Sequence, residues 1–195
     1  MPQWTAQLVF GLGFLAFHTI RAVFGRHHRG RTIVDIRFDL LEKSLLAFVT
    51  LGVIVIPLVY LFSPWLAFAD YSLPSWTIWP GAVIIAAADG LFWRAHIDLG
   101  RNWSPTLEIG DDQTLVTSGL YRYIRHPMYA ATFLFTIGQV VLLPNWIAGP
   151  SALVTFLPLY LLRLPREERM MIDRFDEGYE AYMKRTGRIF PRLLG

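Results

Sequence analysis

The positions of the basic residues constrain this chain more than any other feature. All 18 lysines and arginines lie within residues 21–43, 94–125 and 163–192. Five apolar runs, at residues 4–23, 45–62, 78–96, 128–143 and 146–162, occupy most of the rest of the chain. An apolar run of about 20 residues can cross a bilayer as a helix, and basic residues gather on the cytosolic side. The pattern therefore predicts an integral membrane protein whose basic segments all lie on one side.

We expect an all-α integral membrane protein with five transmembrane helices and a cytosolic C-terminal amphipathic helix. Five crossings with every basic segment in the cytosol leave the N-terminus extracytoplasmic and the C-terminus cytoplasmic. Only Pro144 and Asn145 separate the fourth and fifth runs, which predicts an antiparallel helical hairpin there. Pro165 is expected to break or restart the helix after the fifth run.

Composition agrees with a membrane protein and excludes some sites. Only 17% of the residues are charged, against roughly 25% in a soluble domain. The chain has no cysteine, so disulfides and thiolate metal sites are excluded, and we predict no metal site. The basic pI of about 9.4 could indicate nucleic acid, but the basic residues flank apolar runs. The bilayer, not nucleic acid, is the expected partner, and the oligomeric state is left open.

The chain is expected to divide into two parts. Residues 1–96 would form an N-terminal membrane part with three spans and a basic cytosolic loop. Residues 97–195 would form the catalytic half, with a cytosolic segment, the hairpin and the C-terminal helix. Asp89, within the third run, is either a functional carboxylate or one that pairs with a neighbouring helix or lies in a water-filled cavity.

The stretch Tyr121–Tyr129 concentrates polar and aromatic residues at the start of the fourth run. Pro127 suits the first turn of the helix that follows. Because the fourth and fifth runs form a hairpin, His126 is expected near Arg163 at the end of the fifth run. A pocket there would have aromatic walls and charges of both signs, open to the cytosol and to lipid. It would suit a zwitterionic, aromatic-bearing cofactor and an amphiphilic substrate.

Each of these residues also has a structural interpretation. Arg125 could be only a cytosolic anchor of its span, and His126 could only cap a helix. Arg163 and Glu167 could form an intrahelical ion pair, worth about 0.3–0.5 kcal/mol. Considered together at the mouth of one hairpin, they favour a site.

An ordered set of motifs in the second half resembles the isoprenylcysteine carboxyl methyltransferase family. The set comprises Thr-Leu-Val-Thr-Ser-Gly-Leu-Tyr at 114–121, Arg-His-Pro-Met-Tyr at 125–129, Arg163 with Glu167-Glu168, and Phe175-x-x-x-Tyr179-x-x-Tyr182. The resemblance covers about residues 97–195, and a short chain with five spans resembles the prokaryotic branch. It implies that this half binds S-adenosylmethionine.

Residue by residue, the resemblance implies a cofactor site and a substrate site. Arg163 matches the arginine that holds the substrate's carboxylate. Pro165-Arg166 stands where family members often have further acids, which could alter substrate choice. The cofactor contacts implied are Glu108, Gln113, Thr114, Leu115, Val116, Tyr121, His126, Pro127, Met128, Tyr129 and Glu167.

The expected activity is S-adenosylmethionine-dependent methylation of the carboxylate of an isoprenylcysteine-like or other lipidic acceptor. An ionised carboxylate is already a nucleophile at neutral pH and needs no general base. A first alternative is methylation of a phospholipid amine or small thiol, for which Glu167, Glu168 or His126 would serve as base. A second alternative is a non-enzymatic membrane subunit or a transporter.

Overall fold

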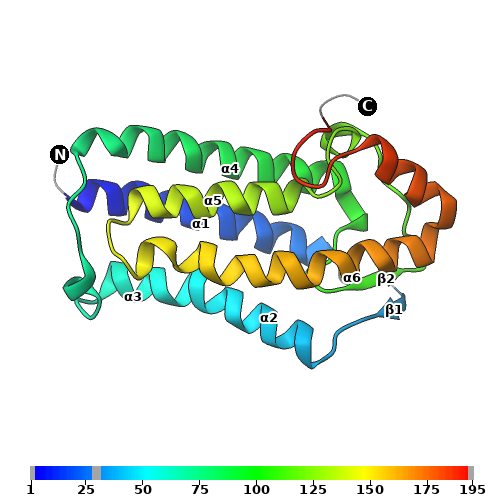
Figure 1. Cartoon of the computed structure of the whole chain (residues 1–195), viewed down its shortest axis with the longest axis horizontal. Helices are drawn as coiled ribbons and strands as arrows, with labels where there is room; N and C mark the ends of the chain where they lie inside the picture. Colours follow the sequence, from blue (N-terminus) through cyan, green and yellow to red (C-terminus); the bar gives the residue numbers. More distant parts are fainter. Residues whose placement is uncertain (1–2, 28–31, 193–195) are drawn as a thin grey trace.

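The computed structural model describes residues 3–27 and 32–192. Its long helices lie side by side along one axis, and the C-terminal segment turns back over one end (Figure 1). Residues 28–31 of the predicted basic loop lie outside the described residues. The helices are α1 (Gln3–His27), α2 (Leu40–Thr50), a π-helical turn (Leu51–Val55), α3 (Ile56–Phe62), α4 (Ile78–Leu99), α5 (Pro127–Leu142) and α6 (Ala148–Arg185), with short 3₁₀ turns between them.

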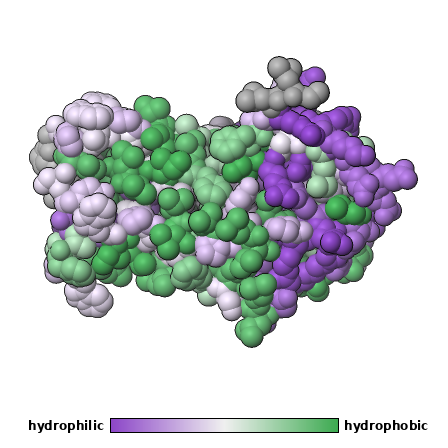
Figure 2. All heavy atoms as spheres, in the orientation of Figure 1, coloured by the Kyte–Doolittle hydropathy of each residue, from purple (hydrophilic) through white to green (hydrophobic). Residues whose placement is uncertain are grey.

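Three helical stretches, Trp4–Gly25, Leu40–Phe62 and Ser75–Asn102, are long and apolar enough to cross a membrane. Only 17%, 28% and 28% of the residues in their apolar windows are buried, so most of these side chains face outward. Figure 2 shows hydrophobic side chains over the long helical part and hydrophilic ones gathered at the end where α6 turns back. This distribution is that of a protein surrounded by lipid along its helices and by water at one end.

The predicted hairpin of the fourth and fifth runs is confirmed as the antiparallel pair α5 and α6. Asn145 holds its tip. The Oδ1 atom accepts hydrogen bonds from the amides of Ile147 (3.0 Å) and Ala148 (2.8 Å), which begin α6. The amide nitrogen Nδ2 donates to Leu66 O (2.7 Å) and Asp70 Oδ1 (2.8 Å), so the same residue fixes the loop after α3. Pro127 lies in the first turn of α5, as predicted.

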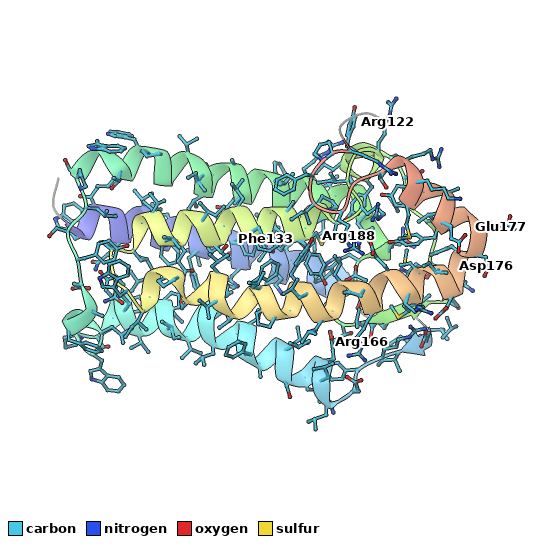
Figure 3. The ribbon with its side chains drawn as sticks, viewed as in Figure 1. Arg122, Phe133, Arg166, Asp176, Glu177 and Arg188 are labelled. Carbon is cyan, nitrogen blue, oxygen red and sulfur yellow. The ribbon has the colours of Figure 1, made fainter. Side chains whose placement is uncertain are left out.

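The expectation that Pro165 breaks the helix is wrong. The helix α6 runs through both Pro158 and Pro165, because each proline removes one amide donor while the hydrogen bonds around it keep the helix continuous. The chain reverses instead at Asp176, whose φ of 47° and ψ of −131° are non-helical. Asp176 and Glu177, labelled in Figure 3, mark this turn at the far end of α6. The segment that follows folds back, and the Tyr182 hydroxyl donates to Tyr121 O at 2.6 Å.

The all-α prediction omits a small two-stranded sheet. Strand β1 (Ile33–Ile36) pairs antiparallel with β2 (Glu108–Gly110), and Ile36 lies opposite Glu108. The amide of Arg37 extends the pairing to Leu107 O at 2.8 Å. Short strands whose partner lies some 70 residues away along the chain have no local signal beyond an apolar run. The sheet fixes the segment that carries Glu108 next to the loop that precedes α2.

The main core lies between α1, α4 and α5. Phe17 stacks on Phe92 with ring centroids 3.9 Å apart and planes at 12°, and Phe135 packs on both Phe10 and Phe17. These residues are at most 4% exposed. The packed side of these helices therefore faces the protein, and α5 is held between the N-terminal helices and α6.

A π-helical turn connects α2 to α3 and lies against α6. It precedes Pro57, whose missing amide interrupts the helical hydrogen-bond ladder. Gly52 within the turn makes the closest approach: the Ser151 hydroxyl donates to Gly52 O at 2.8 Å. A Cβ on Gly52 would lie 2.1 Å from Thr155 Oγ1 and 2.4 Å from Ser151 O. Only glycine fits this contact.

Replacing Gly52 with alanine is therefore expected to push the π turn away from α6. Overpacking of this kind destabilises by about 1–3 kcal/mol. The measurement is thermal unfolding in detergent. Gly90→Ala is the matched control, because a Cβ built there meets no atom within 4 Å outside the local helix backbone, and alanine favours a helix. Equal melting temperatures for the two variants would contradict the close packing at Gly52.

Candidate active site

One cavity of about 280 Å³ collects nearly all the residues that the sequence singled out. It lies between α1, α2 with its π turn, α5, α6 and the segment that joins α4 to β2 and α5. Among the predicted site residues, Glu108, Gln113, Thr114, Leu115, Val116, Tyr121, His126, Met128, Tyr129, Arg163 and Glu167 line it. Pro127 is buried in the first turn of α5 and is not among the lining residues. The structure thus brings together the two sequence segments that the hairpin was expected to join.

Glu167 presents a carboxylate to the cavity. The Tyr129 hydroxyl donates to its Oε2 at 2.8 Å, and His126 Nδ1 lies 3.7 Å from its Oε1. Burial raises the pKa of Glu167, but His126, Arg163 and Tyr129 outweigh it and the net shift of this pKa is downward. The group is therefore ionised at neutral pH and offers a negative charge to a ligand. The structure places this carboxylate in the cavity beside His126, and its role as a cofactor contact stays a prediction.

Glu168 faces away from the cavity and is 4% exposed. It receives hydrogen bonds from Arg125 Nε (3.0 Å) and Arg188 Nη2 (2.9 Å), and His126 Nε2 lies 3.3 Å away. Burial raises the pKa of Glu168, but the contacts to His126 and Arg125 outweigh burial and lower this pKa to about 2. Arg188, labelled in Figure 3, belongs to the C-terminal segment. Glu168 therefore fastens that segment to the start of α5.

His126 lies between these two carboxylates. Burial lowers the pKa of His126, but the nearby carboxylates of Glu167 and Glu168 outweigh burial, and the net shift of this pKa is upward. The imidazole can thus carry a positive charge between two negative ones. This role is more than capping: its backbone amide bonds to Arg188 O at 2.9 Å, and its ring connects Glu168 to Glu167.

Arg125, whose role the sequence left open, mainly makes structural contacts. Besides Glu168, its Nη1 donates to the carbonyls of Met183 (3.2 Å) and Thr186. Arg125 borders the cavity, yet its guanidinium is bonded to the C-terminal segment. It is a buried residue that links the start of α5 to that segment, rather than an exposed anchor at the membrane surface.

Arg163 lines the cavity one helical turn before Glu167. The structure does not show the alternative of an intrahelical ion pair between these two residues. Among the described residues, Arg163 instead forms its ion pair with Glu42 of α2, and its Nε lies 3.1 Å from Glu42 Oε1. Its Nη2 also donates to Pro105 O at 3.3 Å. Sequence reasoning missed Glu42, although an acidic residue beside an apolar run was a usable signal.

Strand β2 and the segments on either side of it supply the polar wall. Glu108 accepts hydrogen bonds from the hydroxyls of Ser104 and Thr106, each at 2.8 Å. Gln113 Oε1 accepts from Gly110 N at 3.1 Å, and Asn102 Oδ1 accepts from Thr114 N at 2.8 Å. These bonds hold the segments in place along the cavity.

Other lining residues were missed, and several of them come from the N-terminal part. Arg21 of α1 lies over the Trp103 ring, with its Cζ 5.7 Å from the ring centroid. Apolar side chains of α2, the π turn and α6 line the cavity beyond Arg163, including Leu46, Val53 and Phe156. Both predicted parts of the chain therefore form the site. Asp89 is not among the lining residues; it lies on α4 where α1 approaches at Gly13.

Known proteins are similar to this chain. The family model described as the isoprenylcysteine carboxyl methyltransferase (ICMT) family matches residues 81–173. The protein-S-isoprenylcysteine O-methyltransferase of Homo sapiens is 33% identical over 123 residues, which cover 62% of this chain and 43% of that protein. Its counterpart in Schizosaccharomyces pombe is 32% identical over 101 residues, which cover 51% of this chain and 43% of that protein.

A solved structure shows the same fold. It is that of the eukaryotic intramembrane Ras methyltransferase ICMT, with a TM-score of 0.52 and 24% identity over 77% of this chain and 50% of that one. The chain thus spans about half the length of the proteins it matches. Through its motifs, its helical fold and these matches, this integral membrane chain is similar to the isoprenylcysteine carboxyl methyltransferase family.

Proposed function

We propose that this protein is an S-adenosylmethionine-dependent methyltransferase of the membrane. Its acceptor would be the carboxylate of an isoprenylcysteine-like or other lipidic molecule, which becomes a methyl ester. The observation that carries the proposal is one cavity lined by both Arg163 and Glu167, with apolar side chains beyond them. The cavity pairs a cation that suits an acceptor carboxylate with an anion that suits a cationic cofactor.

The residues present fit S-adenosylmethionine. Its amino group and sulfonium are cationic, and Glu167 offers an ionised carboxylate held by Tyr129 and His126. Its adenine is aromatic, and Tyr121 and Tyr129 line the cavity. The remaining proposed contacts are Glu108, the backbone of residues 113–116, and Met128 with Pro127 at the start of α5.

Methylation of a carboxylate would require little proton transfer by the protein. When bound, S-adenosylmethionine would supply an electrophilic methyl group, and an ionised carboxylate needs no base to accept it. Arg163 would orient the acceptor's carboxylate through parallel hydrogen bonds. Apolar side chains such as Phe156 and Leu159 would exclude water from it. Alignment and desolvation would therefore account for most of the rate enhancement.

We propose the full topology as well. The apolar stretches Trp4–Gly25, Leu40–Phe62 and Ser75–Asn102 would cross the bilayer with α5 and the first part of α6, which makes five crossings. The basic residues at 94–125 and 163–192 border the cavity end of the molecule. Their positions support a cytoplasmic active site and C-terminus and an extracytoplasmic N-terminus.

A panel of acceptors tests the proposed function. The purified chain in lipid vesicles is given S-adenosylmethionine with a labelled methyl group and one of three acceptors. These are a carboxylic acid that carries an S-prenyl thioether (a prenylated thio-acid), a phospholipid amine and a small alkyl thiol. We expect label in the thio-acid, at a rate that is flat above about pH 5 because the carboxylate is already ionised there. Faster labelling of the amine or thiol, with a rate that rises at alkaline pH, would favour methylation of those groups. No labelling and no cofactor binding would favour a non-enzymatic membrane protein.

A further inference from the structure

Glu42 has no role in the family motifs, yet it is the most completely enclosed carboxylate near the cavity. It lies in the first turn of α2, and 0% of its surface is exposed. Its Oε1 is 3.1 Å from Nε of Arg163. Glu42 is not itself among the residues that line the cavity, whereas Arg163 is. The guanidinium therefore stands between the cavity and a buried negative charge.

Helix capping does not explain this residue. An acid at the third position of a helix often bonds back to the capping residue, and Asp39 does cap α2 by accepting from Glu42 N at 2.9 Å. Among the described residues, however, neither Glu42 oxygen has a hydrogen-bond partner of good geometry, and Arg163 Nε also lacks one. Charge attraction alone links the pair, and burying a carboxylate without hydrogen-bond partners lowers stability.

A nearby ion pair shows that joining α2 to α6 does not require Glu42. Asp39 receives two hydrogen bonds from Arg166, at 2.6 and 3.2 Å. This second link is partly exposed to solvent and lies outside the cavity lining. Arg166, labelled in Figure 3, lies on the side of α6 that faces α2. The two links join the same two helices, but only Glu42 acts on a guanidinium that reaches the cavity.

We propose that Glu42 is a positioning residue that sets how tightly Arg163 holds an anionic acceptor. This inference rests on the proposed function, in which Arg163 binds the acceptor's carboxylate. Glu42 approaches the Nε edge of the guanidinium and Pro105 O holds Nη2, so the end that carries Nη1 remains for a ligand. The negative charge behind Arg163 offsets part of its charge and repels a second carboxylate in front of it.

Such an arrangement suits an enzyme whose substrate is charged and whose product is neutral. An unshielded buried arginine would hold carboxylates tightly, including those that are not methylated. With Glu42 in place, Arg163 has a counter-ion before the acceptor arrives and after the ester has formed. The affinity for the anion is reduced, while the affinity for the neutral ester is unaffected.

The test uses Glu42→Gln, which keeps the size of the side chain and an oxygen near Nε but removes the charge. We expect the KM for a prenylated thio-acid to fall about tenfold, with kcat within about threefold of the unmodified chain. Inhibition by the corresponding methyl ester and the Kd for S-adenosylmethionine should not change. Glu42→Ala also removes the side-chain atoms beside Nε, and its kcat should fall because the guanidinium is no longer confined at that edge.

Asp39→Asn is the matched control, since asparagine still caps a helix but the charge that pairs with Arg166 is lost. Its KM should equal that of the unmodified chain. The inference is overturned if Glu42→Gln leaves the KM for the thio-acid unchanged or raises it, or if Asp39→Asn lowers it equally. Failure of the proposed function has a different signature: no thio-acid is methylated, and neither Arg163→Gln nor Glu42→Gln alters binding of the thio-acid.

Discussion

Replacing Glu167 with alanine is expected to weaken binding of S-adenosylmethionine about a hundredfold or more, because a cationic ligand would lose its ionised partner. The carboxylate is held toward the cavity by the Tyr129 hydroxyl at 2.8 Å and by His126. Its net pKa shift is downward, so the charge is present throughout the neutral range. Isothermal titration calorimetry on the detergent-purified chain would measure the loss.

The folded state should tolerate this change better than the loss of the neighbouring acid. Glu168 holds Arg125, His126 and Arg188, and these contacts stay intact when Glu167 is replaced. Glu177→Ala is the matched control, because that residue is exposed on the returning segment and does not line the cavity. Wild-type affinity in a folded Glu167→Ala variant would contradict the assignment of Glu167 to the cofactor.

Replacing Arg163 with glutamine is expected to affect the cofactor and the acceptor differently. Binding of S-adenosylmethionine should remain, whereas methyl transfer to a carboxylate acceptor should fall about a thousandfold, since an oriented charge-assisted contact is lost. Arg163→Lys keeps the charge without the two parallel donors and should recover only part of the rate. Transfer of labelled methyl groups under saturating cofactor gives the rate for each variant.

The Arg163→Gln variant also leaves Glu42 buried without its cation, which by itself destabilises a protein by about 3–5 kcal/mol. The double variant Arg163→Gln with Glu42→Gln should therefore melt closer to the unmodified chain, yet remain inactive. Recovery of activity together with stability would show that Arg163 has only a structural role. Retention of full activity in the single variant would contradict its role in holding the carboxylate.

Much of the site could be predicted because its residues are close in sequence or joined by an obvious hairpin. Two residues between two apolar runs leave one arrangement, so His126 and Arg163 had to meet at the same end of α5 and α6. The lining by Tyr121, Tyr129 and Glu167 follows from that geometry. The roles assigned to these residues, and the division of the chain at residue 96, stay predictions.

What the sequence did not reveal depends on contacts between distant segments. Glu42 and Arg163 are far apart along the chain, and α2 begins at Leu40, earlier than the apolar run indicated. The pairing of β1 with β2 and the entry of Arg21 into the cavity wall are likewise set by tertiary packing. The reversal of α6 at Asp176 was missed because proline is the stronger local signal, and Pro165 stood closer to the expected break.

The identity of the methylated atom tests the central claim most directly. The purified chain is incubated in vesicles with S-adenosylmethionine carrying a labelled methyl group and a prenylated thio-acid, and the lipid product is treated with alkali. A methyl ester releases its label as volatile methanol, whereas a methylated amine or thioether keeps it. We predict alkali-labile label that depends on Arg163 and Glu167; alkali-stable label, or none in the presence of bound cofactor, would contradict carboxyl methylation.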